Sequence, residues 1–217
     1  MSYLNLTSNE LFEELEKPRM PQEMYEYFYF VFNAVQHNEQ LMAEARLKKG
    51  GFKKFLEEFF PLYCYSQSSY CNTGSKLNII LGNQGYDAVS VNLEGIETFF
   101  EITSFINGEQ QYKNAIELNR DGISSLNFLS NEIIEEYKDG IIANLERKGL
   151  KDYTGVNLIL VVDTSLHFEV LNIGSLNFIK AIISIIEKMN FSFKEIYLLH
   201  EVGNTKDNIE EHFHRIK

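Results

Sequence analysis

Several residue types and patterns are scarce in this chain, and each scarcity excludes a class of protein. Only two of the 217 residues are cysteines, Cys64 and Cys71, which is too few for a disulfide framework or a zinc-finger spacing. No apolar run has the length of a membrane span, because Lys180, Glu187 and Lys188 interrupt or end the longest candidate. The N-terminus has no basic and apolar signal pattern. These absences predict a reduced, cytoplasmic protein with no membrane partner.

Basic residues are also in the minority. The chain has 20 Lys and Arg against 31 Asp and Glu, which gives a formal net charge of −11. That balance tells against a protein that coats nucleic acid through electrostatic attraction. It leaves open an enzyme with a local basic groove, a protein with a basic partner, and a protein that binds divalent cations. Tryptophan is absent, but 17 Phe and 12 Tyr predict a globular protein with an aromatic-rich core.

The hydrophobic periodicity predicts an α/β protein without repeats or flexible linkers. Helices are expected over residues 7–16, 22–49, 52–60, 109–120, 130–148 and 176–189, and strands over 77–81, 86–91, 96–103, 156–162 and 195–200. The last two strands have a helix between them, so they are expected to be parallel. We therefore predict a mixed central β-sheet flanked by helices. An N-terminal helical segment is expected over 1–50 and an α/β core over 51–217, within one compact domain.

Two carboxylates, Asp87 and Glu101, lie on the two strands of a predicted hairpin. A three-residue loop over residues 93–95, with Gly95 in the left-handed conformation, would pair Asn92 with Ile96. Paired positions then sum to 188, which places Asp87 opposite Glu101. Side chains so opposed have Cβ atoms roughly 5 Å apart, and two carboxylates at that spacing repel unless a proton or a cation lies between them. The hairpin therefore predicts a cation site.

Two simpler interpretations of the carboxylates exist. In the first, both side chains are solvated charges at strand ends. In the second, the loop is one residue longer or shorter than assumed, which places the two side chains on opposite faces of the sheet. The surroundings favour burial, since both faces of the hairpin are rich in apolar side chains and such strands are usually covered on both sides. Buried acids need partners and often mark metal or catalytic sites. The apolar neighbours are Tyr86, Ala88, Val89, Val91, Phe99, Phe100 and Ile102.

Four short segments carry a resemblance to a known family. Residues 57–62 read Glu-Glu-Phe-Phe-Pro-Leu on a helix, 86–89 read Tyr-Asp-Ala-Val, and 101–103 read Glu-Ile-Thr. Residues 108–118 begin Gly-Glu-Gln-Gln-Tyr and form the helix that follows. Over roughly residues 50 to 200 this order resembles the PD-(D/E)XK nuclease superfamily, which has the restriction-endonuclease-like fold.

The resemblance implies a metal-dependent nuclease. Asp87 and Glu101 would bind Mg²⁺ or Mn²⁺, and the carbonyl oxygen of Ile102 would be a further ligand, as hard cations prefer. Glu58, or its neighbour Glu57, would be the helical acid that completes the metal shell. The ion would lower the pKa of a bound water and hold the scissile phosphate for in-line attack.

The sequence departs from the superfamily at one catalytic position. A lysine is expected two residues after the Glu, on the same strand face, and this chain has Thr103 there. Threonine cannot supply the positive charge that is thought to position the attacking water. Lys113, on the following helix, is the nearest candidate for a lysine that has moved to another element.

The alternative function is a catalytically inactive protein of the same fold that binds another protein, as an immunity or regulatory module. The missing lysine and the acidic composition favour it. A nuclease would need a local basic groove for nucleic acid, and the candidate side chains for one are Lys48, Lys49, Lys53, Lys54, Lys113 and Arg120.

The histidines predict no metal site. If His212 and His214 lie on one helix, they do not share a face, because residues two apart in a helix point in different directions. His200 is isolated in sequence.

Overall fold

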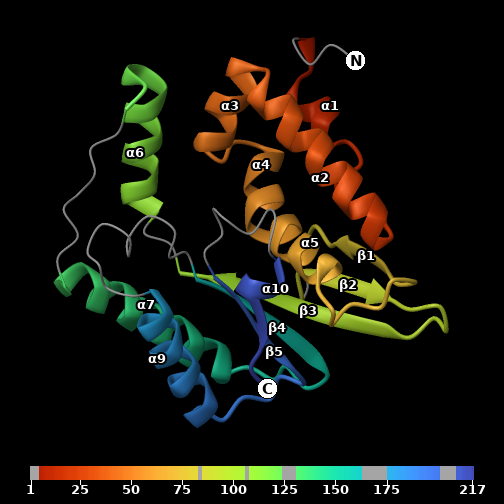
Figure 1. Ribbon diagram of the computed structural model, residues 1–217, viewed down its shortest axis with the longest axis vertical. Helices are drawn as coiled ribbons and strands as arrows, with labels where there is room; N and C mark the ends of the chain where they lie inside the picture. The colour runs from red at the N-terminus through yellow and green to blue at the C-terminus, as the bar shows by residue number, and fades with distance from the viewer. Residues whose placement is uncertain (1–4, 83–84, 106–107, 124–130, 163–174, 201–208) are drawn as a thin grey trace. The chain divides into compact units, whose positions relative to one another are not determined.

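The computed structural model describes residues 5–82, 85–105, 108–123, 131–162, 175–200 and 209–217 (Figure 1). The chain divides into two compact units that alternate along the sequence. The first unit comprises residues 1–97 and 106–126, and the second comprises residues 98–105 and 127–217. The division into an N-terminal helical segment over 1–50 and an α/β core over 51–217 within one compact domain stays a prediction.

The protein is α/β, with a six-stranded mixed sheet in the order β1-β2-β3-β4-β5-β6 and flanking helices. Strands β3, β4 and β5 pair in parallel, whereas β1 with β2 and β5 with β6 pair antiparallel. The parallel pairing of β4 and β5 confirms the expectation from the sequence. The strands are β1 (Lys76–Ile79), β2 (Ala88–Val91), β3 (Glu97–Ser104), β4 (Val156–Val162), β5 (Ile196–His200) and β6 (Phe213–Arg215).

The first unit is mainly helical. An Asn38 side chain that accepts from Leu41 N (3.1 Å) starts a new helix, so the single helix predicted over 22–49 is in fact two. Its helices are α1 (Ser8–Phe12), α2 (Pro21–Gln36), α3 (Glu39–Arg46), α4 (Gly51–Lys54), the π-helix η2 (Phe55–Phe59), α5 (Phe60–Gln67) and α6 (Gly108–Asp121).

The helix that was predicted to end before Pro61 continues through it to Gln67. The reason is the π turn η2, in which Phe60 N–H bonds to Phe55 O, five residues back. Proline normally disrupts a helix because it lacks an N–H and its ring crowds the carbonyl four residues earlier. Here Pro61 lies in the first turn after the wider π turn, where a missing donor is tolerated.

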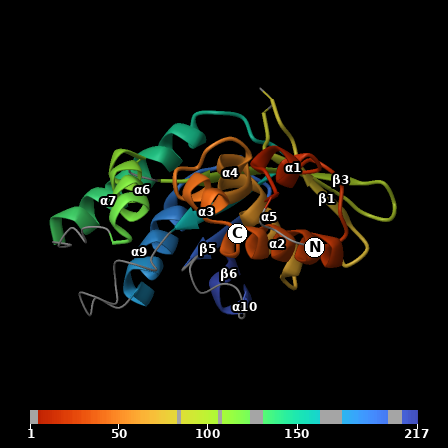
Figure 2. The same ribbon diagram turned by 90° about the horizontal axis from the view of Figure 1, so that it is seen from above.

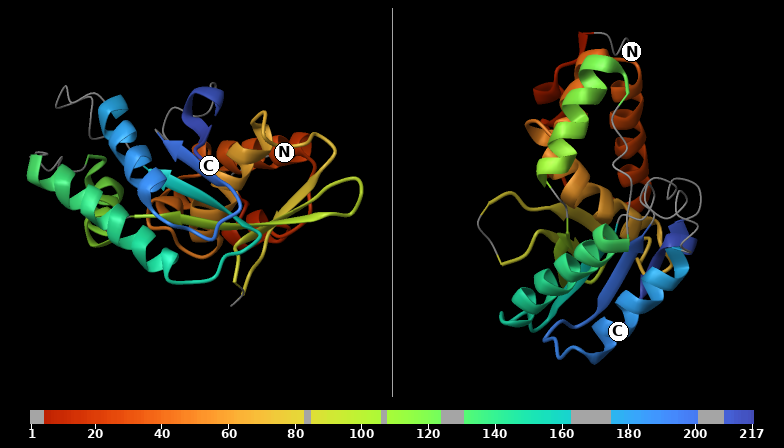
Figure 3. Two further views of the ribbon diagram at one scale, coloured as in Figure 1. Left: turned by 90° about the horizontal axis from the view of Figure 1, so that it is seen from below. Right: turned by 90° about the vertical axis from the view of Figure 1, so that its left-hand side faces the viewer.

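The second unit packs two long helices on one sheet face. Figures 1 and 3 show α7 (Asn131–Gly149) and α9 (Ser175–Lys188) side by side along β4 and β5. Alternate residues of the strands point toward these helices, as the period of two requires. The core on this face includes Leu158, Leu160, Ile182 and Leu198, each at most 1% exposed. The short helix α10 (Ile209–His212) and strand β6 lie beside β5 (Figure 2).

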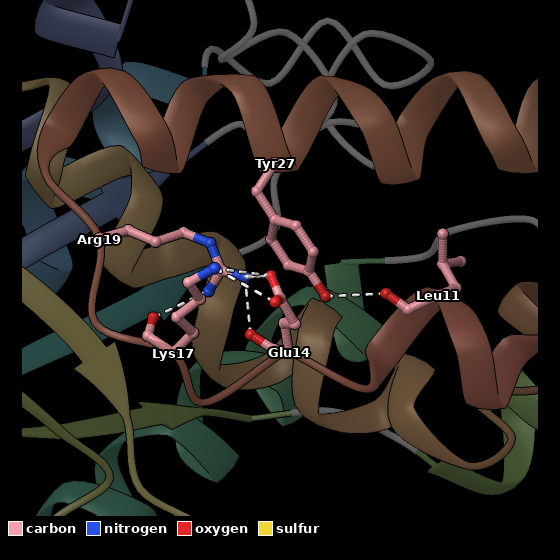
Figure 4. Close-up of polar contacts among 5 residues, drawn as sticks. All are labelled: Leu11, Glu14, Lys17, Arg19 and Tyr27. Carbon is pink, nitrogen blue, oxygen red and sulfur yellow. Dashed lines mark hydrogen bonds and ion pairs between the residues drawn. The ribbon is translucent and has the colours of Figure 1, made fainter. Parts of the chain in front are cut away.

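A buried arginine ties the N-terminal helices of the first unit to its sheet. Arg19 is 5% exposed, and its backbone exchanges two hydrogen bonds with Leu77 of β1. Its guanidinium donates to the carbonyl oxygens of Lys17 (2.8 Å) and Glu14 (2.6 Å), as Figure 4 shows. The guanidinium carbon lies 3.9 Å from the ring centroid of Tyr27. Carbonyls and an aromatic face thus replace the water that this charge loses.

Tyr27 completes this arrangement from α2. Its hydroxyl donates to the carbonyl oxygen of Leu11 (2.9 Å), which joins α2 to α1 (Figure 4). Burial raises the pKa of Tyr27 to about 12, against the opposing charge of Arg19. The phenol therefore stays a neutral donor over the whole physiological pH range.

We expect Arg19→Lys to destabilise the protein by about 2 kcal/mol, because an ammonium cannot make the forked bonds to two carbonyls or stack on Tyr27. Urea unfolding followed by circular dichroism measures this. The control is Arg120→Lys, since Arg120 pairs with Asp121 at an exposed position and its replacement should leave stability nearly unchanged. Equal effects of the two variants would contradict the anchoring role of Arg19.

Candidate functional site

Helix α7 lies along strand β3 through residue pairs of matched spacing. Four residues of an α-helix advance about 6.0 Å and two residues of a strand about 6.6 Å, so contacts can repeat along both elements. Every fourth residue of the helix takes part in these contacts. On the other side, every second residue takes part, from β3 and from Phe105, which directly follows the strand. The three pairs are Gly140 with Phe105, Asn144 with Thr103, and Lys148 with Glu101.

The first pair fixes how closely the helix approaches the strand. A Cβ atom on Gly140 would come within 2.2 Å of the Phe105 ring, so only glycine fits against the ring as it stands. This close approach brings the polar side chains of the next two pairs within reach of each other.

The third pair brings a lysine to Glu101. Lys148 Nζ donates to Glu101 Oε1, and the two side chains are 19% and 10% exposed. Lys148 also lies 5.9 Å from the ring centroid of Tyr153, itself buried. A buried carboxylate is strongly disfavoured without a counter-charge, and Lys148 supplies one from a position 47 residues away in the sequence.

The second pair positions Thr103, the residue found where the nuclease family has its lysine. Asn144 Nδ2 donates to Thr103 Oγ1 (2.9 Å) and to the carbonyl oxygen of Ser104 (3.1 Å). Asn144 Oδ1 in turn accepts from Arg147 (2.8 Å). Thr103 and Asn144 are both 8% exposed. The Thr103 hydroxyl therefore accepts from the helix and has its own proton to donate.

Ile102 lies between these two β3 residues in sequence. It pairs with Ile159 in the parallel ladder to β4 and is buried. The role of its carbonyl oxygen as a metal ligand stays a prediction.

The helical acids Glu57 and Glu58 lie on the π turn η2 of the first unit. Glu57 pairs with Lys48 (2.9 Å), and the Glu57 side chain is 28% exposed. Glu58 is the more buried of the two, with 13% exposure, and its Oε1 accepts from Lys54. Glu58 Oε2 is fully buried and has no hydrogen-bond partner. Isolated π turns inside α-helices often occur at functional sites.

Asp87 lies within electrostatic reach of Glu58. Burial is the main cause that raises the pKa of Glu58, Lys54 opposes it, and the negative charge of Asp87 raises it further. The pKa of Glu58 thus responds to the charge of Asp87. Asp87 itself is partly buried directly before β2, and its carbonyl oxygen accepts from Ile80 N (2.8 Å).

The predicted hairpin loop is present. Asn92 N donates to the carbonyl oxygen of Ile96 (3.1 Å), and Gly95 has a φ of 78°. A side chain at Gly95 would be strained by this left-handed conformation. The further step, in which the same register places Asp87 opposite Glu101, stays a prediction.

The basic side chains that were predicted to line a groove mostly have acidic partners. Lys113 pairs with Glu109 (2.7 Å) on the exposed surface of α6. The other pairs are Lys48 with Glu57, Lys54 with Glu58, and Arg120 with Asp121, whereas Lys49 and Lys53 are exposed. Lys148, and not Lys113, is the lysine that contacts Glu101.

The donor set of Glu58 and Asp87 suits a hard cation. A buried carboxylate oxygen with no hydrogen-bond partner, beside a second carboxylate, is the oxygen-rich setting that Mg²⁺ and Mn²⁺ prefer. In the described part of the chain, however, no three His, Cys, Asp or Glu side chains are grouped closely enough to hold an ion.

Sequence reasoning missed Lys148, Asn144 and Arg147. These residues belong to α7, which was predicted as a helix, but nothing in the sequence links them to β3. The one available signal is a spacing of four residues between Gly140, Asn144 and Lys148, next to the apolar residues Ile141 and Leu145 of the same helix.

Comparison of the chain with protein-family models, curated proteins and solved structures finds no match. In the described ranges, no helix has the length and apolar character needed to cross a membrane. The chemistry of these side chains is therefore the basis for a functional assignment.

We expect Lys148→Met to destabilise the protein by about 3 kcal/mol, because it leaves the Glu101 carboxylate buried without a counter-charge. Glu101→Gln in the same molecule should recover part of that loss, and urea unfolding of both single variants and the double variant measures the coupling. Lys138→Met is the control, since Lys138 pairs with the exposed Glu135 on the same helix. Simple additivity of the two single changes would contradict a direct ion pair.

We expect Glu58→Gln to be more stable than the wild type at pH 7. The raised pKa means that the folded protein binds this proton more tightly than the unfolded chain. The stabilisation from protonated Glu58 is thus complete below its ordinary pKa of 4.5 and is lost as the pH rises through the folded value. Glutamine removes that loss.

Urea unfolding between pH 4 and pH 7 measures this difference, which should shrink toward pH 4. Glu57→Gln is the matched control on the adjacent, more exposed residue and should show no such gain. A Glu58→Gln variant less stable than the wild type at pH 7 would show that the Lys54 pair outweighs burial.

Proposed function

We propose that the protein is a divergent, metal-dependent nuclease-like protein of the restriction-endonuclease-like fold, which acts on phosphodiester bonds of nucleic acid. The observation that supports this most is the buried contact of Lys148 with Glu101. It neighbours the contact of Asn144 with Thr103 between the same helix and strand. Lys148 supplies, from α7, the positive charge that Thr103 cannot provide. The α/β architecture with a mixed sheet is compatible with such a fold.

In this proposal Mg²⁺ or Mn²⁺ takes its protein ligands from among Asp87, Glu58, Glu101 and the carbonyl oxygen of Ile102. The bound ion would lower the pKa of a water ligand and offset charge on the phosphate. Glu58 contributes its buried, unpartnered Oε2. Glu101 is held in place by Lys148 before the ion arrives.

Lys148 and Thr103 act on the substrate side. An ammonium group attracts a phosphate oxygen or orients the attacking water, and a low-dielectric setting strengthens either contact. Thr103 donates its hydroxyl proton to the phosphate or to the water, because Asn144 already occupies one of its acceptor positions. Arg147, bonded to Asn144, adds a second positive charge beside this pair.

Cation binding in this scheme is an exchange. Lys54 satisfies one oxygen of Glu58, and Lys148 satisfies one oxygen of Glu101. Each lysine would give up its carboxylate to the divalent ion and turn toward the incoming phosphate. The acids thus remain neutralised both with and without metal.

A second candidate function is an inactive protein of this fold that binds a basic protein partner. The same ion pairs favour it, because Lys54 and Lys148 neutralise the inward carboxylates without any metal. Four of the six basic side chains proposed for a groove are paired with acids, and the net charge is −11. An acidic surface attracts a basic partner.

We expect the purified full chain to cleave DNA or RNA in the presence of Mg²⁺ or Mn²⁺ and not in EDTA. Asp87→Asn and Lys148→Met should each lower the cleavage rate by about a hundredfold or more, as loss of an essential proton-transfer or charge-stabilising group does. Lys138→Met, a surface change on the same helix, should cleave as the wild type does. Calorimetric titration of Mn²⁺ into Asp87→Asn and Glu101→Gln tests whether one ion uses both acids.

A folded wild type that neither cleaves nor binds Mn²⁺ would contradict the nuclease function. In that case a basic protein that binds in a salt-sensitive manner would support the second function.

A further inference from the structure

Three histidines that are distant in sequence meet at the β5–β6 edge of the second unit. His200 is the last residue of β5, His212 is the last residue of α10, and His214 lies in β6. On one helix, residues 212 and 214 would point in different directions. The helix instead ends at His212 and a strand begins at the next residue, so that divergence does not apply.

The strand register explains the meeting. Leu198 pairs with His214 and Leu199 with Phe213 in the antiparallel ladder, and continuing that register places His200 opposite His212. Opposed residues of an antiparallel pair share a sheet face, as do residues two apart in a strand. The imidazoles of His200 and His214 therefore project from one face, and the ring of His212 contacts that of His200.

His200 and His214 form a hydrogen bond between their Nε2 atoms, and the separation of these two nitrogens is also close to that of two ligands around one ion. Their Nε2 atoms are 3.1 Å apart, and the two rings are nearly parallel, with centroids 5.2 Å apart. Two nitrogens bound to zinc at about 2.05 Å are about 2.9 Å apart at a right angle and about 3.3 Å apart at the tetrahedral angle. The observed separation lies between these values.

His212 supports this pair from the side. Its ring lies edge-to-face against His200, at 79° and with centroids 5.2 Å apart. His200 and His212 are 8% and 9% exposed, whereas His214 is half-buried and gives solvent access. The packing limits rotation of His200, so little ordering is needed when an ion binds.

We propose that His200 and His214 form a binding site for a divalent late-transition-metal ion such as Zn²⁺. Imidazole nitrogen is the preferred ligand type for Zn²⁺, Cu²⁺ and Ni²⁺ and a poor one for Mg²⁺. Because the described residues contain no group of three suitable side chains, water or a solute fills the remaining positions. The ion would join β6 to β5. This site is separate in residues and in metal preference from the carboxylates of the proposed nuclease function.

Titration calorimetry of Zn²⁺ into the full chain at pH 7.5 tests the site. We expect one ion to bind the wild type and His214→Gln to bind at least tenfold more weakly. His37→Gln is the matched control, because His37 is exposed on the first unit and contacts Asn33 O (2.8 Å). Asp87→Asn should bind Zn²⁺ as the wild type does.

A measurement on the wild type alone guards against a variant that misfolds. Zn²⁺ should shift the imidazole NMR resonances of His200 and His214 and leave those of His37 unchanged. Failure of the wild type to bind Zn²⁺, or equal binding by His214→Gln, would overturn the proposal. Loss of Zn²⁺ binding in Asp87→Asn with retention in His214→Gln would also overturn it and assign the ion to the carboxylates.

Discussion

The match in repeat between helix α7 and strand β3 is the constraint on which the chemistry of the second unit depends. Because four helical residues and two strand residues advance by nearly the same length, one face of α7 meets one face of β3 several times. Gly140 sets the separation, and Asn144 and Lys148 then reach polar groups of the strand. A buried glutamate is acceptable there only because the helix supplies a lysine at that level.

The same solution occurs independently in the first unit, where Glu58 has Lys54 one turn earlier. In both places a helix-borne lysine neutralises an acid that the fold has removed from solvent. This arrangement is compatible with two opposite functions. A lysine that releases its acid to a metal ion prepares a catalytic site, and a lysine that keeps its acid makes an inert, stable core. The relative affinity of each carboxylate for lysine and for a divalent ion distinguishes them.

The sequence predicted those elements whose patterns are local. The apolar run of β4 was predicted with its observed bounds, and the turn at Gly95 was predicted from glycine's conformational freedom. Periodicity could not show that Asn38 would cap a new helix, or that a π turn would carry the helix through Pro61. It also missed β6, since three residues show no period. The Lys148–Glu101 contact depends on tertiary packing, which no spacing within either segment encodes.

The π turn at Phe55–Phe59 has a consequence for how this protein can change. A π turn holds one residue more than an α turn, and each helical residue rotates the chain by about 100°. Loss of a single residue there would restore an ordinary helix and rotate everything on one side of it against the other. Neighbouring glutamates would then exchange directions, outward for inward. The choice of inward acid is thus a matter of rotational phase, which one deletion or insertion can reset.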